Sequence, residues 1–276
     1  MLCSGTLPRG TTFDERVAAA ADAGFRGVSL WGRDYAGGRA EGWSDSDMRS
    51  ILDDHGLAVA ELDPAWWWLP GADKFRIAPE YDTLDLFRFG EEEIFAVADA
   101  LGARSLNAVD VLGGSFTVEE AAEAFEALCV RASEHGLVVH LEWLPWSRIP
   151  DLAAALKIVE MAAAPNGGLT VDAWHLTRAD TDLDALRNVP GDLIRAIQLG
   201  DGPLQPEDDL MEAALHNRRL PGEGEFDLAG IVGALRETGT SAPLGVEVFS
   251  DSLHALGPHE AARRAASATR QVVQDR

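Results

Sequence analysis

Cysteine and long apolar runs are both scarce in this sequence. Its two cysteines, Cys3 and Cys129, exclude a disulfide-stapled scaffold and a zinc site built on thiolates. No uninterrupted apolar stretch approaches the roughly 20 residues needed to cross a bilayer. The first ten residues also lack the basic segment and apolar stretch of a secretory leader. These absences predict a cytoplasmic protein that does not act at a membrane.

Positive charge is scarce as well. The 276 residues include 23 lysines and arginines against 46 aspartates and glutamates, which gives a net charge of −23. Such a surface repels phosphate backbones, so we expect no nucleic-acid partner. Apolar residues make up 46% of the chain, enough for a full globular core.

One pattern recurs along the chain: an alanine-rich amphipathic stretch, a glycine-containing break, and then a short apolar run. A glycine just after a periodic apolar segment is typical of a helix end, and the short run that follows is typical of a buried strand. Eight such strands alternating with helices predict a single (β/α)₈ barrel domain over residues 1–276. A doubly wound sheet is disfavoured because no glycine-rich phosphate turn follows the first strand. The expected strands are Leu2–Thr6, Gly27–Trp31, Leu57–Leu62, Ser105–Val109, Val138–Trp143, Leu169–Ala173, Ile194–Leu199 and Leu244–Val248.

Two long breaks follow expected strands, at Asp63–Asp82 and Asp201–Phe226. Loops that follow strands form the active-site face of a (β/α)₈ barrel. Both breaks are therefore expected to contribute to a functional site.

Oxygen-bearing side chains stand at the ends of the last four expected strands. Glu142, Asp172 and Glu247 are carboxylates in otherwise apolar runs, and Gln198 holds the matching place on the remaining strand. Buried carboxylates are costly unless they are paired or bound to a metal. Each one alone could be a salt-bridged residue at a strand end, but four together favour a divalent cation. An all-oxygen set suits Mg²⁺ or Mn²⁺, with Co²⁺ or Zn²⁺ as alternatives.

The same residues resemble the metal site of the xylose-isomerase-like superfamily of barrels, in which a Glu, an Asp, a His or Gln and a second Glu end strands five to eight. Glu142, Asp172, Gln198 and Glu247 match that set, and Gln in the third place resembles the hydroxypyruvate isomerase and 3-dehydroshikimate dehydratase branches. Three further motifs carry the resemblance. They are the Asp-x-x-His of Asp172–His175, the Gln-Leu-x-Asp-x-Pro of Gln198–Pro203, and the His-x-Arg-x-x-Pro-Gly-x-Gly of His216–Gly224.

The resemblance implies an enzyme that moves a carbon-bound proton of a small hydroxy-ketone through an enediolate. It implies Glu142 and Glu247 as the base and acid, with His175, His216 and Arg218 at the substrate. An isomerase or epimerase acting on a sugar, cyclitol or keto-glycoside is the leading interpretation. A dehydratase similar to 3-dehydroshikimate or inosose dehydratase is the alternative. An apurinic-site endonuclease or a non-catalytic barrel fits less well, given the charge of −23 and the intact ligand set.

The chain departs from the related isomerases at two places. No Glu ends the second expected strand, and the third is followed by the aromatic run Trp66–Trp68. Clustered tryptophans usually mark a binding surface, so we expect an apolar cap over the pocket, with substrate contacts from Trp31, Trp67 and Trp143. A subunit contact or lid packing would explain the same run, and we expect a homo-oligomer, a dimer or tetramer.

Overall fold

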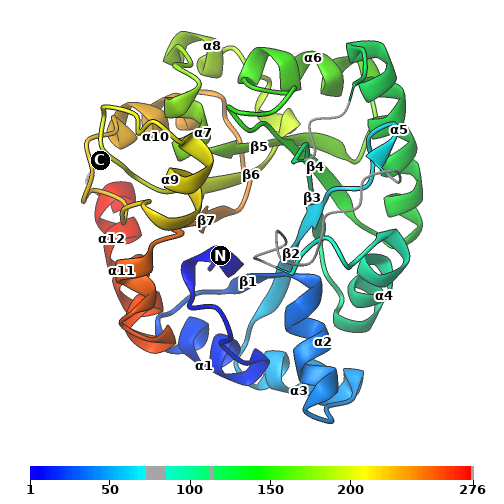
Figure 1. Ribbon diagram of the computed structural model, residues 1–276, viewed down its shortest axis with the longest axis vertical. Coiled ribbons are helices and arrows are strands. Elements are labelled where there is room, and N and C mark those ends of the chain that lie inside the picture. The colour runs from blue at the N-terminus through cyan, green and yellow to red at the C-terminus, as the bar shows by residue number, and fades with distance from the viewer. Residues whose placement is uncertain (73–84, 112–114, 275–276) are drawn as a thin grey trace.

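The computed structural model describes residues 1–72, 85–111 and 115–274. Within them, seven parallel strands form one sheet in which each strand pairs with the next along the chain (Figure 1). Predominantly apolar runs flanked by helices produce such strands because both faces of a parallel sheet are covered. The strands are β1 (Gly27–Leu30), β2 (Ala58–Ala65), β3 (Ser105–Val109), β4 (Val138–Glu142), β5 (Gly167–Asp172), β6 (Ile194–Leu199) and β7 (Leu244–Val246).

The sheet closes through the first residues of the chain. Leu2 forms parallel bridges to both Val28 of β1 and Val246 of β7. The Leu2 amide donates to the Gly27 carbonyl at 2.9 Å, and the Cys3 amide donates to the Val246 carbonyl at 3.1 Å. The eighth strand position of the predicted barrel is therefore filled by a single bridging residue.

The expected first strand, Leu2–Thr6, is shorter than predicted. From Ser4 the backbone forms the 3₁₀ turn η1 (Ser4–Thr6). The Ser4 amide donates to the Ser29 hydroxyl at 2.7 Å instead of to a strand carbonyl, so the ladder ends there.

Helices surround the sheet on its outer side (Figure 1). Three of the major ones begin with a reciprocal capping box, formed by Thr12 with Glu15, Ser44 with Asp47, and Thr117 with Glu120. The helices are α1 (Phe13–Asp22), α2 (Gly32–Ala40), α3 (Asp45–Asp54), α4 (Glu91–Leu101), α5 (Val118–Glu134), α6 (Leu152–Ala162), α7 (Ala173–Arg178), α8 (Leu183–Arg187), α9 (Leu210–His216), α10 (Leu228–Glu237), α11 (Asp251–His254) and α12 (Pro258–Gln274), with a short 3₁₀ turn η3 (Gly191–Leu193) before β6. None of the described helices combines the length and apolarity needed to cross a bilayer.

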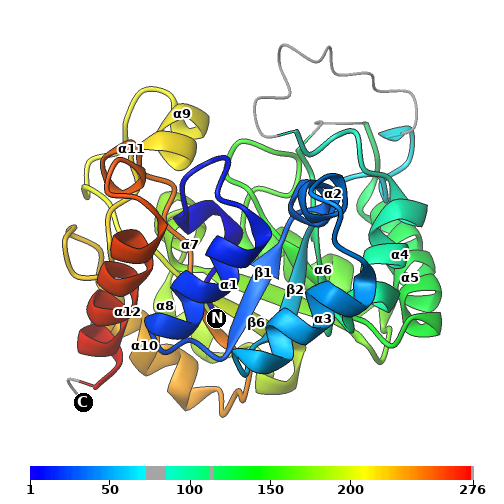
Figure 2. The same cartoon turned by 90° about the horizontal axis from the view of Figure 1, so that it is seen from below.

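The segments that follow the strands gather at one end of the molecule. Figure 2 shows α9, after β6, and α11, after β7, together at that end, while α12 runs back toward the opposite one. Of the two breaks expected to be functional, residues 73–82 lie outside the described residues. The break at Asp201–Phe226 contains α9.

Candidate active site

Four strands deliver the predicted oxygen donors to this end of the barrel. Glu142 is the last residue of β4, Asp172 is the last of β5, and Glu247 directly follows β7. Gln198 of β6 is the register partner of Asp172. The three carboxylates are buried, with exposed fractions of 6%, 1% and 5% in that order, and Gln198 is fully buried.

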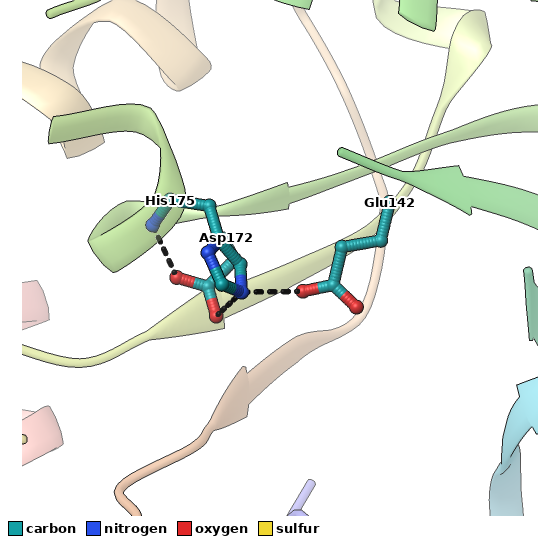
Figure 3. A group of neighbouring side chains, drawn as sticks. All are labelled: Glu142, Asp172 and His175. Atoms are coloured by element: carbon teal, nitrogen blue, oxygen red, sulfur yellow. Dashed lines mark hydrogen bonds and ion pairs between the residues drawn. The ribbon is translucent and has the colours of Figure 1, made fainter. Parts of the chain in front are cut away.

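Glu142, Asp172 and His175 form a compact group of potential metal ligands, each offering an atom within 4.8 Å of the others (Figure 3). The His175 Nε2 atom lies 3.5 Å from Glu142 Oε1 and 3.9 Å from Asp172 Oδ2. Asp172 also caps α7, because its Oδ1 accepts hydrogen bonds from the amides of Trp174 and His175. The cap therefore fixes the histidine against the two carboxylates.

Arg218 balances the negative charge of this group. Its Nη1 atom donates to Asp172 Oδ2 at 2.8 Å and to Glu247 Oε2 at 3.3 Å. Its Nε donates to the Ala214 carbonyl at 2.9 Å, and its Nη2 lies 3.3 Å from His175 Nε2. One guanidinium thus ties the ends of β5 and β7 to the start of the loop that follows α9.

Burial and neighbouring charge shift the ionisation of these groups in different directions. Burial, and then the charges of Glu247 and Asp172, raises the pKa of Glu142 well above its usual range. Burial raises the pKa of Glu247 to about 8, although Arg218 lowers it. Burial alone would raise the pKa of Asp172, but Arg218 and His175 outweigh it and the pKa is lowered. Burial lowers the pKa of His175 to about 3, so its ring is neutral at physiological pH.

Two buried oxygens in this cluster have no hydrogen-bond partner among the described residues. They are Glu142 Oε1 and Gln198 Oε1. The amide nitrogen of Gln198 donates to Glu61 at 3.4 Å, which leaves its oxygen as the free end. Unpartnered buried oxygens beside two further carboxylates suit a hard divalent cation, so the residues present fit a metal ion.

Asn107 and Asp63 belong to the site, although sequence reasoning missed them. The Asn107 amide donates to Glu142 Oε2 at 2.5 Å and to Asp63 Oδ1 at 3.0 Å. Asp63 also accepts a hydrogen bond from the Trp31 indole at 3.0 Å. Asn107 is the register partner of His140. Each of these polar residues lies inside an otherwise apolar run, and this is the signal in the sequence that could have indicated Asn107.

A cavity of about 110 Å³ opens beside the carboxylates. Charged and aromatic side chains from six different segments line it, namely Asp63, Glu142, Trp146, His175, Arg218 and Glu247, together with Phe249. Both proposed proton-transfer carboxyls, the histidine and the arginine therefore face one small space.

The other predicted substrate contacts do not line this cavity. Trp143 is fully buried in the core. The Trp67 indole donates to Glu91 of α4 at 2.9 Å. His216 lies near the surface with its Nδ1 3.0 Å from Asp251. Trp31 and His216 instead line a neighbouring cavity.

The tryptophan run packs onto the barrel's own elements. Trp66 and Trp68 donate to the carbonyls of Phe89 and Val109, both at 2.9 Å. Trp68 is 5% exposed. Among the described residues, Trp146 lines the cavity beside the carboxylates, whereas Trp66, Trp67 and Trp68 do not.

Asp201 organises the long loop after β6. Its two carboxylate oxygens accept hydrogen bonds from four backbone amides, which belong to Gly202, Gly222, Gly224 and Phe226. A Cβ atom at Gly224 would lie 2.1 Å from Asp201 Oδ1, so the close approach requires glycine. The aspartate and glycines of the two loop motifs thus hold the loop that carries Arg218.

A parallel barrel whose strand ends bring together buried carboxylates, an amide and a histidine defines a class of (β/α)₈ proteins with a candidate site at the ends of its strands. The chain belongs to the xylose isomerase-like TIM barrel family, whose model matches residues 17–272. This confirms the predicted family and barrel fold.

Relatives in this family are enzymes. The chain is 30% identical over 265 residues to the 3-dehydroshikimate dehydratase of Pseudomonas putida, a match that covers 91% of this chain and 37% of the dehydratase. The chain therefore spans little more than a third of that relative's length. It is 28% identical over 144 residues to the inosose isomerase of Bacillus subtilis, covering 51% of each protein.

The fold also matches solved structures. The crystal structure of the IOLI protein with a zinc atom superposes with a TM-score of 0.82 at 19% identity, covering 99% of this chain and 97% of that one. At this identity the likeness concerns the fold.

Proposed function

We propose that this protein is a divalent-metal-dependent enzyme that removes a proton from the carbon beside the carbonyl of a small hydroxy-ketone. The observation that carries the proposal is the placement of two buried carboxyls, Glu142 and Glu247, on one cavity beside the unpartnered Glu142 oxygen. Paired carboxyls with raised pKa values are suited to giving and taking protons near neutral pH.

Glu142, Asp172, Gln198 and Glu247 would hold the metal, with Mn²⁺ or Mg²⁺ as the expected ion. The free Glu142 and Gln198 oxygens support this assignment, as does the zinc atom in the IOLI structure. A bound divalent ion supplies Lewis-acid polarisation of the substrate carbonyl, which acidifies the neighbouring C–H bond.

The protein's own groups then move the proton. Glu247 takes it from carbon, because Arg218 contacts this carboxyl and opposes the rise that burial gives its pKa. Glu142 gives a proton back, since its pKa is raised well above the usual range. His175, neutral and fixed by the α7 cap, orients a substrate hydroxyl.

The atom that receives the returning proton decides the product. Delivery to a neighbouring carbon, or to the opposite face of the same carbon, gives an isomer or epimer. Delivery to a β-hydroxyl expels water, so the C–H and C–O bonds break and a C=C bond forms. The dehydratase match along 91% of this chain favours the second outcome, and the inosose isomerase match favours the first.

The test is turnover in deuterated water with Mn²⁺, followed by proton NMR, with 3-dehydroshikimate and an inosose as substrates. Dehydration is expected to produce new unsaturated-carbon proton signals, and isomerisation is expected to place solvent deuterium on carbon. Glu142→Gln should abolish both. An isomer formed without deuterium, or full activity in Glu142→Gln, would contradict the proposed proton transfer.

A further inference from the structure

A second cavity of about 180 Å³ opens beside the first at the same end of the barrel. Its walls are largely apolar, formed by Leu7, Trp31, Leu215 and Phe249. The polar residues Arg9, His216, Asp251 and His254 also line it. Trp31 follows β1, Phe249 follows β7, and Leu215 lies on α9. Three active-face segments therefore build this space together.

The two cavities share a wall. Leu215 and Phe249 line both of them. Phe249 stands two residues after Glu247, and its ring lies 5.3 Å from the guanidinium carbon of Arg218. The second cavity therefore adjoins the one that Glu247 lines.

The two aromatic rings that line the second cavity stack on each other. The rings of Trp31 and Phe249 stack with their centroids 6.0 Å apart and an interplanar angle of 18°. A Cβ atom at Gly5 would lie 2.2 Å from the Phe249 ring, so only glycine lets the ring lie in this place. The hydrogen bond from the Trp31 indole to Asp63 fixes the other ring.

Two of the polar side chains around this cavity are engaged with the protein itself, and a third, Arg9, is exposed to solvent. His216 Nδ1 pairs with Asp251 at 3.0 Å, and His254 Nε2 pairs with the Gly5 carbonyl at 2.9 Å. The walls of this cavity therefore offer a ligand more apolar contacts than hydrogen bonds. An apolar cavity of about 150 Å³ holds one benzene ring, so this one has room for a six-membered ring.

We propose that the second cavity is a binding subsite for an uncharged, apolar ring attached to the hydroxy-ketone substrate. This inference rests on the proposed function, because it places the reacting end of the same molecule beside Glu142 and Glu247. It defines the substrate class as a hydroxy-ketone that carries a ring substituent.

The test compares phenyl β-D-glucopyranoside with methyl β-D-glucopyranoside by isothermal titration calorimetry on the Mn²⁺-loaded protein. The phenyl compound should bind roughly tenfold to a hundredfold more tightly, as expected for burying one ring. His216→Trp places bulk at the cavity edge from a side chain that is 42% exposed, and it should remove this advantage. His259→Trp on α12, also at an exposed histidine, is the matched control and should keep it.

A second measurement is made on the wild-type protein, and a cavity variant serves only to assign one resonance. In the wild-type protein the phenyl compound should shift the indole N–H resonance of Trp31, identified by its loss in Trp31→Phe, while the methyl compound should not. Equal affinity of the two glucosides, no saturable binding of the phenyl compound, or an advantage that persists in His216→Trp would overturn the subsite. Glu142→Gln should still prefer the phenyl compound while losing proton transfer, so failure of the subsite and failure of the proposed reaction are distinguishable.

Discussion

At the scale of single residues, the site is a balance of buried charge. Asp172 keeps its ionised form because Arg218 pairs with it and the amides of Trp174 and His175 donate to it. Among the described residues, Glu142 has only the neutral amide of Asn107 as a hydrogen-bond donor. Buried charges are tolerated only when they are paired or hydrogen-bonded. The carboxylates at this barrel mouth therefore differ in proton affinity although they share one cavity.

Arg218→Leu should destabilise the metal-free protein strongly, because it leaves Asp172 buried without its cationic partner. Breaking such a buried pair costs about 3–5 kcal/mol. Urea denaturation measures the effect, and added Mn²⁺ should restore part of the loss, since a bound cation would neutralise the same carboxylates. Stability equal to the wild type would contradict the role assigned to Arg218.

Asn107→Leu should weaken Mn²⁺ binding by about tenfold to a hundredfold, the usual effect of removing a group that orients a ligand. The amide holds Glu142 Oε2 and so directs Oε1 toward the other donors. Equilibrium dialysis measures the affinity. Asn188→Leu is the control, because the Asn188 amide donates to the nearby Asp184 carbonyl on the surface. Equal affinity in both variants would disprove this orienting role.

The sequence made four residues of the site predictable, namely Glu142, Asp172, Gln198 and Glu247, but not Asp63 or Asn107. Glu142, Asp172 and Glu247 stand out because carboxylates are rare inside apolar strands. Asn107 looks like an ordinary strand residue until its register with β4 is known. Trp143 was predicted to contact the substrate, but it is buried in the core. Adjacent strand residues point to opposite faces, so the residue after Glu142 points away from the cavity.

At the scale of elements, strand boundaries followed the apolar runs closely. Seven of the eight predicted strands correspond to β1 to β7, although β2 continues to Ala65, beyond the predicted Leu62, and β7 ends at Val246, before the predicted Val248. The predicted strand Leu2–Thr6 is the one that differs most from the structure. There the Ser4 amide donates to the side-chain hydroxyl of Ser29 instead of to a strand carbonyl. A local sequence pattern does not predict tertiary contacts of this kind.

The loop after β6 depends on one carboxylate, and Asp201→Asn tests it. Each of the four amide hydrogen bonds needs an acceptor, and an asparagine NH₂ group would face two of these amides with donors. We expect a loss of about 2–3 kcal/mol in the free energy of unfolding, given the strength of hydrogen bonds to charged groups.

Hydrogen exchange locates the effect. The amides of Gly222, Gly224 and Phe226 should exchange faster in Asp201→Asn, while those of β3 keep their wild-type protection. Unchanged exchange in this loop would show that other contacts hold it.

At the scale of the whole molecule, closure of the ring depends on the bridge at Leu2. Leu2→Pro removes the donor to the Gly27 carbonyl at the junction of β1 and β7. We expect a lower midpoint of thermal unfolding, measured by circular dichroism, and early loss of protection in β1 and β7. An unchanged midpoint would contradict the closing role of this residue.

The predictions of a single domain, a homo-oligomer and a cytoplasmic location concern the whole molecule as well. They stay predictions, and light scattering after size-exclusion chromatography measures the oligomeric state directly. The net charge of −23 sets the electrostatic context of the site. An anionic ligand would approach against this field, which favours a neutral or singly charged substrate.

The most direct test of the central claim is a Mn²⁺ titration of the metal-free protein against the double variant Glu142→Gln, Glu247→Gln. Calorimetry should give about one ion per chain for the wild type and no comparable binding for the double variant, because it removes two of the three proposed carboxylate ligands. Binding of equal affinity and stoichiometry in both proteins would contradict the assignment of the site.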